Sequence, residues 1–132
     1  MIKFNLFAAC ALAGMAFAAL AADPLPPPSP RPNVTYTADI KPIFDDSCVK
    51  CHRGKKPHGK LKLDSLQGVL KGGQDGKVVI PGNSAKSLLV RSVAHTTTDH
   101  DLWMPTNKKK NAQPLTPEQI GLIRAWIDQG AK

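Results

Sequence analysis

Residues 48–52 read Cys48-Val49-Lys50-Cys51-His52, two cysteines separated by two residues, with a histidine directly after the second. Two intervening residues let one helical turn present both thiols to neighbouring edges of a single planar ligand. The next residue then lies beneath that ligand, where its imidazole can reach a central metal ion. This C-x-x-C-H spacing is typical of covalent haem attachment. We therefore predict one haem c, with thioether bonds from Cys48 and Cys51 and with His52 as the proximal iron ligand.

Three other kinds of site use a similar cysteine pair. A thiol–disulfide oxidoreductase carries its C-x-x-C motif after a strand and at the start of a helix, whereas here the motif follows a helical pattern. A structural zinc site needs four ligands, so His52 and a distant histidine would have to join the two cysteines. A plain disulfide across the tight two-residue gap is the third alternative. We favour haem because a helix enters the motif and a histidine follows it.

Met104 is the predicted sixth ligand of the iron. It lies on a long irregular stretch between two predicted helices, and such a loop can reach the distal face of a haem. A thioether is a soft ligand that favours ferrous iron and raises the reduction potential. The alternatives are His58, His95 and His100, or a Met104 that only fills the core. Ligand type and loop position favour Met104.

The N-terminus has the pattern of a secretory signal peptide over residues 1–22. Lys3 supplies a positive charge, an alanine-rich apolar run covers residues 6–20, and small residues end the segment. The alternative is an uncleaved membrane anchor, but the run is shorter than the roughly 20 residues that span a bilayer. We expect an exported, periplasmic protein that contacts a membrane only if this segment is retained. Cleavage would leave Met104 as the sole methionine.

A proline-rich linker is predicted over residues 23–35, followed by one domain over residues 36–132. The linker begins DPLPPPSPRPN, a composition typical of an extended, semi-rigid spacer. A domain of about 100 residues can bury only a small core. A prosthetic group inside that core would help to stabilise it, and we expect a monomer.

The formal net charge of the chain is +8. Exposed positive charge steers a protein toward acidic partners, so acidic redox-partner proteins are expected. Nucleic acid is not, because the basic residues are scattered and aromatic residues are few. The lysines nearest the predicted haem ligands in the sequence are Lys50, Lys55, Lys56, Lys108, Lys109 and Lys110.

Four short helices are predicted. The last is the clearest, because Thr116-Pro117-Glu118-Gln119 forms a capping box with proline at the first helical position. Its apolar stripe comprises Ile120, Ile123, Trp126 and Ile127. The first helix covers residues 36–47 with Thr37 as its N-cap, and its apolar face comprises Ile40, Ile43 and Phe44.

The two middle helices are shorter. One has Asp64 or Ser65 as its cap and ends at the Gly72-Gly73 pair. The other has Asn83 or Ser84 as its cap and carries Leu88, Leu89, Val90 and Val93. No alternation of strands and helices is visible, so a parallel sheet is not expected.

The chain from about Tyr36 to Ala131 resembles a class I cytochrome c domain, and most closely the planctomycete-type cytochrome C group. The resemblance implies a small all-α fold of about four short helices around one covalent haem, with the first and last helices crossing. It also implies iron held by histidine and methionine. The matching residues are Phe44, Cys48, Cys51, His52, Leu61-Lys62-Leu63-Asp64, Gly72-Gly73, Gly76, Ile80-Pro81-Gly82, Ser87-Leu88-Leu89, Arg91, Met104-Pro105 and Trp126-Ile127-Asp128-Gln129-Gly130-Ala131.

These features together predict an electron carrier rather than an enzyme, one that passes single electrons between partners through the iron. A haem-binding sensor with a labile sixth ligand is the alternative from another class. A thiol–disulfide oxidoreductase or a small peroxidase is the enzymatic alternative. One haem motif and no distal Arg/His pair at a recognisable spacing argue against a peroxidase.

Overall fold

The computed structural model describes residues 24–106 and 113–132. The expected signal peptide, residues 1–22, and the lysine run 108–110 lie outside these ranges. The described residues form four α-helices and no strand, which confirms the all-α prediction. None of these helices is long and apolar enough to cross a membrane. The helices are α1 (Lys41–Ser47), α2 (Leu66–Lys71), α3 (Leu88–Val93) and α4 (Pro117–Asp128).

Helix α4 begins with the predicted capping box. The Thr116 hydroxyl accepts a hydrogen bond from the Gln119 amide at 3.2 Å, and the Thr116 amide donates to Oε1 of Gln119 at 3.0 Å. Pro117 occupies the first turn, where its missing N–H has no partner to lose. The predicted stripe of four apolar residues is fully buried.

The first helical segment begins at Tyr36, as predicted, but its cap is a different residue. A π-helical turn, Tyr36–Ile40, precedes α1, and its N-cap is Thr35, so the prediction of Thr37 was wrong. The Thr35 hydroxyl accepts from the Ala38 amide at 3.3 Å. Asp39 reaches back to the Thr35 amide at 2.8 Å, a reciprocal pair that Thr37 cannot form with Asp39.

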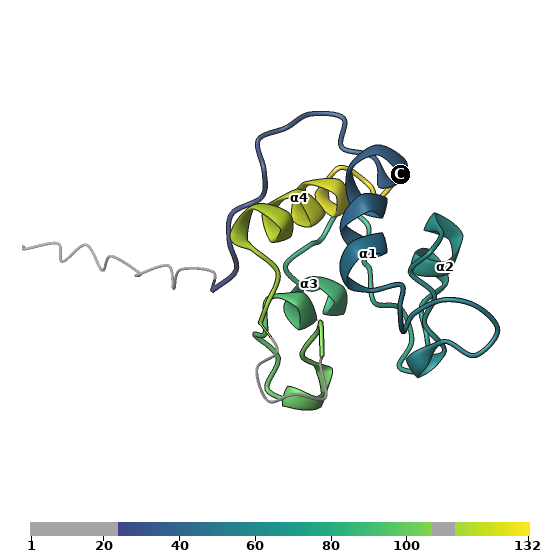
Figure 1. The fold of residues 1–132 in the computed structure, drawn as a ribbon. Helices are drawn as coiled ribbons and strands as arrows, with labels where there is room; N and C mark the ends of the chain where they lie inside the picture. The colour runs from purple at the N-terminus through teal and green to yellow at the C-terminus, as the bar shows by residue number, and fades with distance from the viewer. Residues whose placement is uncertain (1–23, 107–112) are drawn as a thin grey trace, which may run out of the picture.

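The first and last helical segments pack against each other as expected (Figure 1). The Tyr36 ring lies 6.2 Å from the Phe44 ring, edge-on, and 6.0 Å from the Trp126 ring. Ile40, Phe44 and Trp126 have no solvent exposure. Aromatic side chains bury the largest apolar area per residue, so this contact is the centre of the small core.

Helix α2 begins and ends as the sequence predicts. Ser65 is the N-cap and accepts from the Gly68 amide at 3.1 Å. Gly72 ends the helix with φ +82°, and a Cβ there would lie 2.2 Å from the Gly76 carbonyl oxygen. Only glycine meets both conditions.

Helix α3 begins later than predicted. Ser87 is its N-cap, not Asn83 or Ser84. Asn83 holds the preceding turn through a 3.1 Å bond to the Lys86 amide. Ser84 is bound by the Asp128 carboxylate of α4 through both its amide and its hydroxyl, at 2.8 and 2.9 Å. Both candidate caps therefore have other partners.

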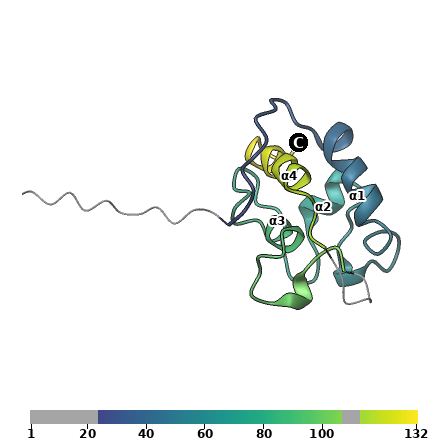
Figure 2. The same cartoon turned by 60° about the vertical axis from the view of Figure 1, so that its left-hand side comes forward.

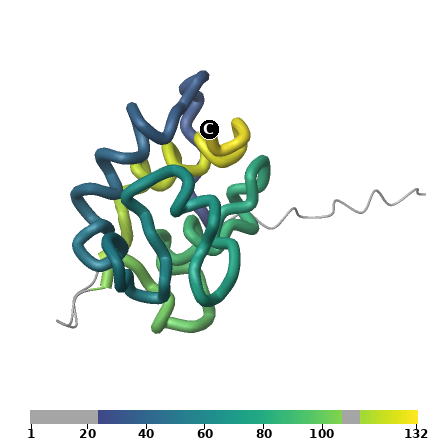
Figure 3. The backbone as a smooth tube through the Cα atoms, turned by 90° about the vertical axis from the view of Figure 1, so that its right-hand side faces the viewer, coloured from purple at the N-terminus to yellow at the C-terminus, as the bar shows by residue number. Residues whose placement is uncertain are grey.

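Residues 24–35, the described part of the predicted linker, lie along α4 (Figures 1 and 2). They end next to the C-terminus (Figure 3), where the Tyr36 amide donates to the Lys132 carbonyl at 2.8 Å. Leu25 is only 7 % exposed, and the Ser29 amide donates to the Gly121 carbonyl at 2.9 Å. The Arg124 guanidinium donates to the Pro26 carbonyl at 2.6 Å. This N-terminal segment (residues 24–35) is therefore packed onto the domain and not extended away from it.

Candidate cofactor site

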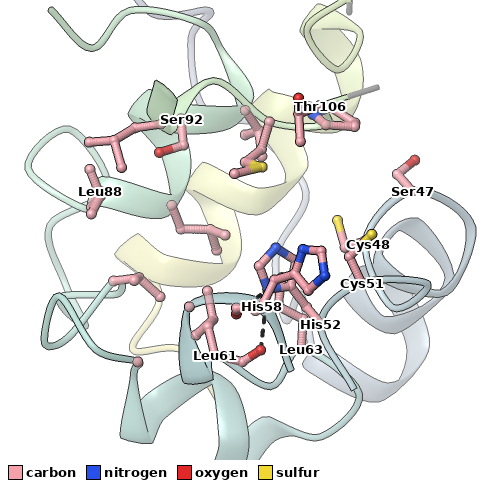
Figure 4. Close-up of a pocket in the computed structure, with 18 of the residues that line it drawn as sticks. Ser47, Cys48, Cys51, His52, His58, Leu61, Leu63, Leu88, Ser92 and Thr106 are labelled. Atoms are coloured by element: carbon pink, nitrogen blue, oxygen red, sulfur yellow. Dashed lines mark hydrogen bonds between the residues drawn. The ribbon is translucent and has the colours of Figure 1, made fainter. Parts of the chain in front are cut away.

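A cavity of about 370 Å³ lies between the C-x-x-C-H motif and α3. Its volume falls within the roughly 300–1,000 Å³ usual for small-molecule and cofactor pockets. Figure 4 shows Cys48, Cys51 and His52 on one side of this space and Leu88 and Ser92 of α3 on the other. The apolar side chains that line the cavity are Leu61, Leu63, Val78, Leu88, Leu89, Val93, Leu102, Met104 and Pro105.

The cysteine motif forms one turn directly after α1, which ends at Ser47. The amides of Cys51 and His52 both donate to the Cys48 carbonyl, at 3.2 and 3.1 Å. Both thiols are free. Burial, with a smaller contribution from Asp46, raises the pKa of Cys48 to about 11, while Cys51 is exposed. The two thiols therefore lie on a single turn, as two bonds to one porphyrin require.

The His52 imidazole is oriented by backbone carbonyls. Its Nδ1 lies 3.1 Å from the His58 carbonyl and 3.2 Å from the Leu61 carbonyl. Because a carbonyl only accepts, Nδ1 carries the proton and Nε2 keeps its lone pair. Burial lowers the pKa of His52, which favours the neutral ring. A neutral imidazole held by its other nitrogen is the usual state of a histidine metal ligand.

Met104 lines the same cavity as the motif. Its amide donates to the Ser92 carbonyl near the end of α3 at 3.1 Å. The fold thus brings all four predicted site residues, Cys48, Cys51, His52 and Met104, to one cavity. Met104 is half-buried and packs against the core.

The alternative axial histidines are placed differently. His58 lines the cavity, and Figure 4 shows its ring beside that of His52, on the motif side. Nε2 of His95 lies 3.1 Å from the Met104 carbonyl, and neither His95 nor His100 lines the cavity. Of these candidates, only Met104 both lines the cavity and is bonded through its backbone to Ser92 of α3, across the cavity from the motif.

The donor set and the lining fit a haem. Two thiols, one neutral imidazole and one thioether surround a mainly apolar space, which suits a flat hydrophobic ring carrying an iron atom. Within residues 24–106 and 113–132, no group of three His, Cys, Asp or Glu side chains could hold a metal ion by itself.

Two parts of the site were not predicted from the sequence. The carbonyls that hold His52 belong to His58 and Leu61. Every residue has a backbone carbonyl, so the sequence does not indicate which ones bond to His52. The wall formed by Ser92 and Val93 depends on where α3 lies against the motif. The leucines of α3 were recognised as apolar helix residues and as part of the family resemblance, but not as part of the cavity.

Residues 48–107 match the family model described as Planctomycete cytochrome C. The match begins at Cys48 and includes Met104, so all four predicted site residues fall inside it. No curated protein and no solved structure matches the chain.

Proposed function

Because residues 48–107 carry a planctomycete cytochrome C domain, we propose that this protein is a mono-haem c-type cytochrome that carries single electrons between redox partners. The family implies a covalent haem and haem-based electron transfer. The proposal adds that the iron is held by His52 and Met104, that residues 1–22 direct export to the periplasm, and that the protein is a carrier without its own catalytic reaction.

One observation carries the proposal: Cys48, Cys51, His52 and Met104 line a single cavity. The bound haem would supply a one-electron centre at its iron. Cys48 and Cys51 would hold the ring by thioether bonds, and His52 would present Nε2 to the iron because the His58 and Leu61 carbonyls hold Nδ1. The Met104 thioether would favour the ferrous state.

Visible spectra of the purified protein, oxidised and reduced, test the ligand set. We expect a c-type spectrum, with the weak ferric sulfur-to-iron band that reports methionine ligation. The Met104→Leu variant should keep its covalent haem and lose that band. A wild-type spectrum without the band, together with carbon monoxide binding at neutral pH, would instead support a sensor with a labile sixth ligand.

Acidic redox proteins are the proposed partners. Lys50, Lys55 and Lys56 are all exposed within or just after the motif, so they place three positive charges near the cysteines that would form the thioethers. Charges of opposite sign accelerate association and lose this effect as salt rises, because the Debye length shrinks from about 30 Å at 0.01 M to about 10 Å at 0.1 M.

The ionic-strength dependence of electron transfer tests this steering. With an acidic redox protein, the bimolecular rate should fall as salt increases, and the triple variant Lys50→Gln, Lys55→Gln, Lys56→Gln should show a weaker dependence. The matched control replaces Lys62, Lys71 and Lys77 with glutamine, because these residues line a separate surface groove beside α2. A rate independent of salt would remove the steering role.

A further inference from the structure

Trp103, directly before Met104, is held by the loop around it. Its indole N–H donates to the Thr97 carbonyl at 3.2 Å. The His95 ring stacks on the indole at 4.9 Å between centroids and 12° between planes. The His100 ring also contacts it, at 4.0 Å and 34°. The segment that leads into Met104 is thus packed by its own side chains.

His95 also bonds to the backbone of Met104. Its Nε2 lies 3.1 Å from the Met104 carbonyl oxygen, and because that oxygen only accepts, Nε2 carries the proton and donates. The Met104 amide donates to the Ser92 carbonyl of α3. Both polar groups of the Met104 backbone therefore have partners at or just after the C-terminal end of α3.

His95 is held where this bond requires it. It follows α3 closely, and its amide donates to the Ser92 carbonyl at 3.2 Å. Its φ is +55°, a left-handed conformation that asparagine and histidine adopt more readily than most residues. The turn that ends α3 thus directs one imidazole toward both Trp103 and the Met104 carbonyl.

We propose that His95 is a positioning residue for the sixth iron ligand: its Nε2–H holds the Met104 carbonyl and thereby keeps the thioether directed into the haem cavity. This proposal rests on the proposed function, since it presupposes that Met104 binds the iron. His95 itself would not contact the haem, because it does not line the cavity.

Two substitutions of His95, to glutamine and to asparagine, distinguish this hydrogen-bonding role from simple packing, because their side-chain amides differ in length. The side-chain amide of glutamine reaches about as far as Nε2 of histidine, whereas the asparagine amide is shorter. Asparagine also tolerates the positive φ at this position. We therefore expect His95→Gln to keep the ligand and His95→Asn to loosen it. His100→Ala is the matched control, because it removes a contact on Trp103 and leaves the bond to Met104 intact.

The readouts are the ferric sulfur-to-iron band, the affinity of the ferrous protein for carbon monoxide, and thermal unfolding of the holoprotein. Loss of one hydrogen bond should raise the population with Met104 dissociated about threefold to tenfold. Carbon monoxide affinity in His95→Asn should rise by the same factor. His95→Gln and His100→Ala should stay within about twofold of wild type.

The outcomes distinguish this proposal from the proposed function. A wild-type protein with covalent haem but no sulfur-to-iron band overturns the methionine ligation and this proposal with it, while the haem assignment stands. A normal wild-type band with an unchanged His95→Asn variant overturns the positioning role alone. Equal loosening in His95→Asn and His95→Gln also overturns it, because stacking on Trp103 would then be the property that matters.

Discussion

At the scale of a single residue, burial in the core changes the acidity of the Tyr36 hydroxyl. It is the only tyrosine of the chain, and its hydroxyl donates to the Leu63 carbonyl at 2.9 Å inside the core. Burial, with Asp45 and Asp64 nearby, raises the pKa of Tyr36 to about 12. The bond connects the start of the first helix to the residues just before α2.

The raised pKa predicts how alkaline solution affects stability. The unfolded chain loses the Tyr36 proton near pH 10, whereas the folded chain retains it to about pH 12. Between these values the unfolded state binds fewer protons, so stability falls as pH rises. Tyr36→Phe should lower stability at neutral pH by about 1–3 kcal/mol, because it leaves the Leu63 carbonyl unpaired. It should also flatten the decline above pH 10.

Urea unfolding of the holoprotein at several pH values between 8 and 11.5 measures both effects. The difference between wild type and Tyr36→Phe isolates the contribution of this phenol to the pH dependence of stability. Parallel curves for the two proteins would contradict the assignment of the shift to Tyr36.

At the scale of the secondary-structure element, the absence of a side chain at Gly121 lets the N-terminal segment pack closely against α4. A Cβ at this position would lie 2.8 Å from the Pro27 carbonyl oxygen, too close for the backbone of the N-terminal segment to stay in place. Glycine within a helix costs about 1 kcal/mol relative to alanine. Gly121 therefore makes α4 intrinsically less stable, but it allows the helix to contact residues 24–35.

Gly121→Ala should release the N-terminal segment while leaving α4 helical. The Ser29 amide, now bonded to the Gly121 carbonyl, should exchange its hydrogen faster, by about tenfold or more if the segment detaches as a unit. Hydrogen exchange with peptide-level mass spectrometry measures this, and the α3 peptide serves as the internal reference. Unchanged exchange in residues 24–35 would show that the helix accommodates the methyl group without releasing the segment.

Local signals predicted the elements that depend on local chemistry. The capping box at Thr116 and Gln119, the Ser65 cap and the C-x-x-C-H turn each involve residues only a few positions apart. The predicted Thr37 cap failed among local alternatives, because Thr35 forms the reciprocal pair with Asp39. The predicted Ser84 cap failed because a distant partner decides. Ser84 does not cap α3 because Asp128 binds it.

The same division holds for the site. The cysteines and His52 were predicted from a five-residue pattern. Met104 was predicted from its ligand type, its loop position and its being the sole methionine after residues 1–22. The bond from His95 to the Met104 carbonyl has no sequence signal, because one partner is backbone and the other is an ordinary histidine.

At the scale of the whole molecule, the hydrophobic core is small and lies next to a cavity that is lined mainly by apolar side chains. Most of its large, fully buried side chains come from the first helical segments, α3 and α4, while Leu61, Leu63 and Leu89 line the cavity. A haem in that space would cover these side chains and join the motif to α3. The cofactor is thus expected to act as part of the core.

Removing the attachment points should therefore unfold the domain in large part. The Cys48→Ala, Cys51→Ala double variant should lose haem and most of its helical circular dichroism, with Met104→Leu, which keeps the thioethers, as the control. A haem-free double variant with wild-type helicity and a cooperative thermal transition would contradict the role of haem in the core.

The most direct measurement of the central claim is the intact mass of the protein purified from a host competent in haem attachment. The site and the family match over residues 48–107 predict the polypeptide mass plus one haem. This mass should be unchanged after acidified organic extraction, because two thioether bonds would hold the ring to Cys48 and Cys51. Bare polypeptide mass, in cells that attach haem to another c-type cytochrome, would contradict it.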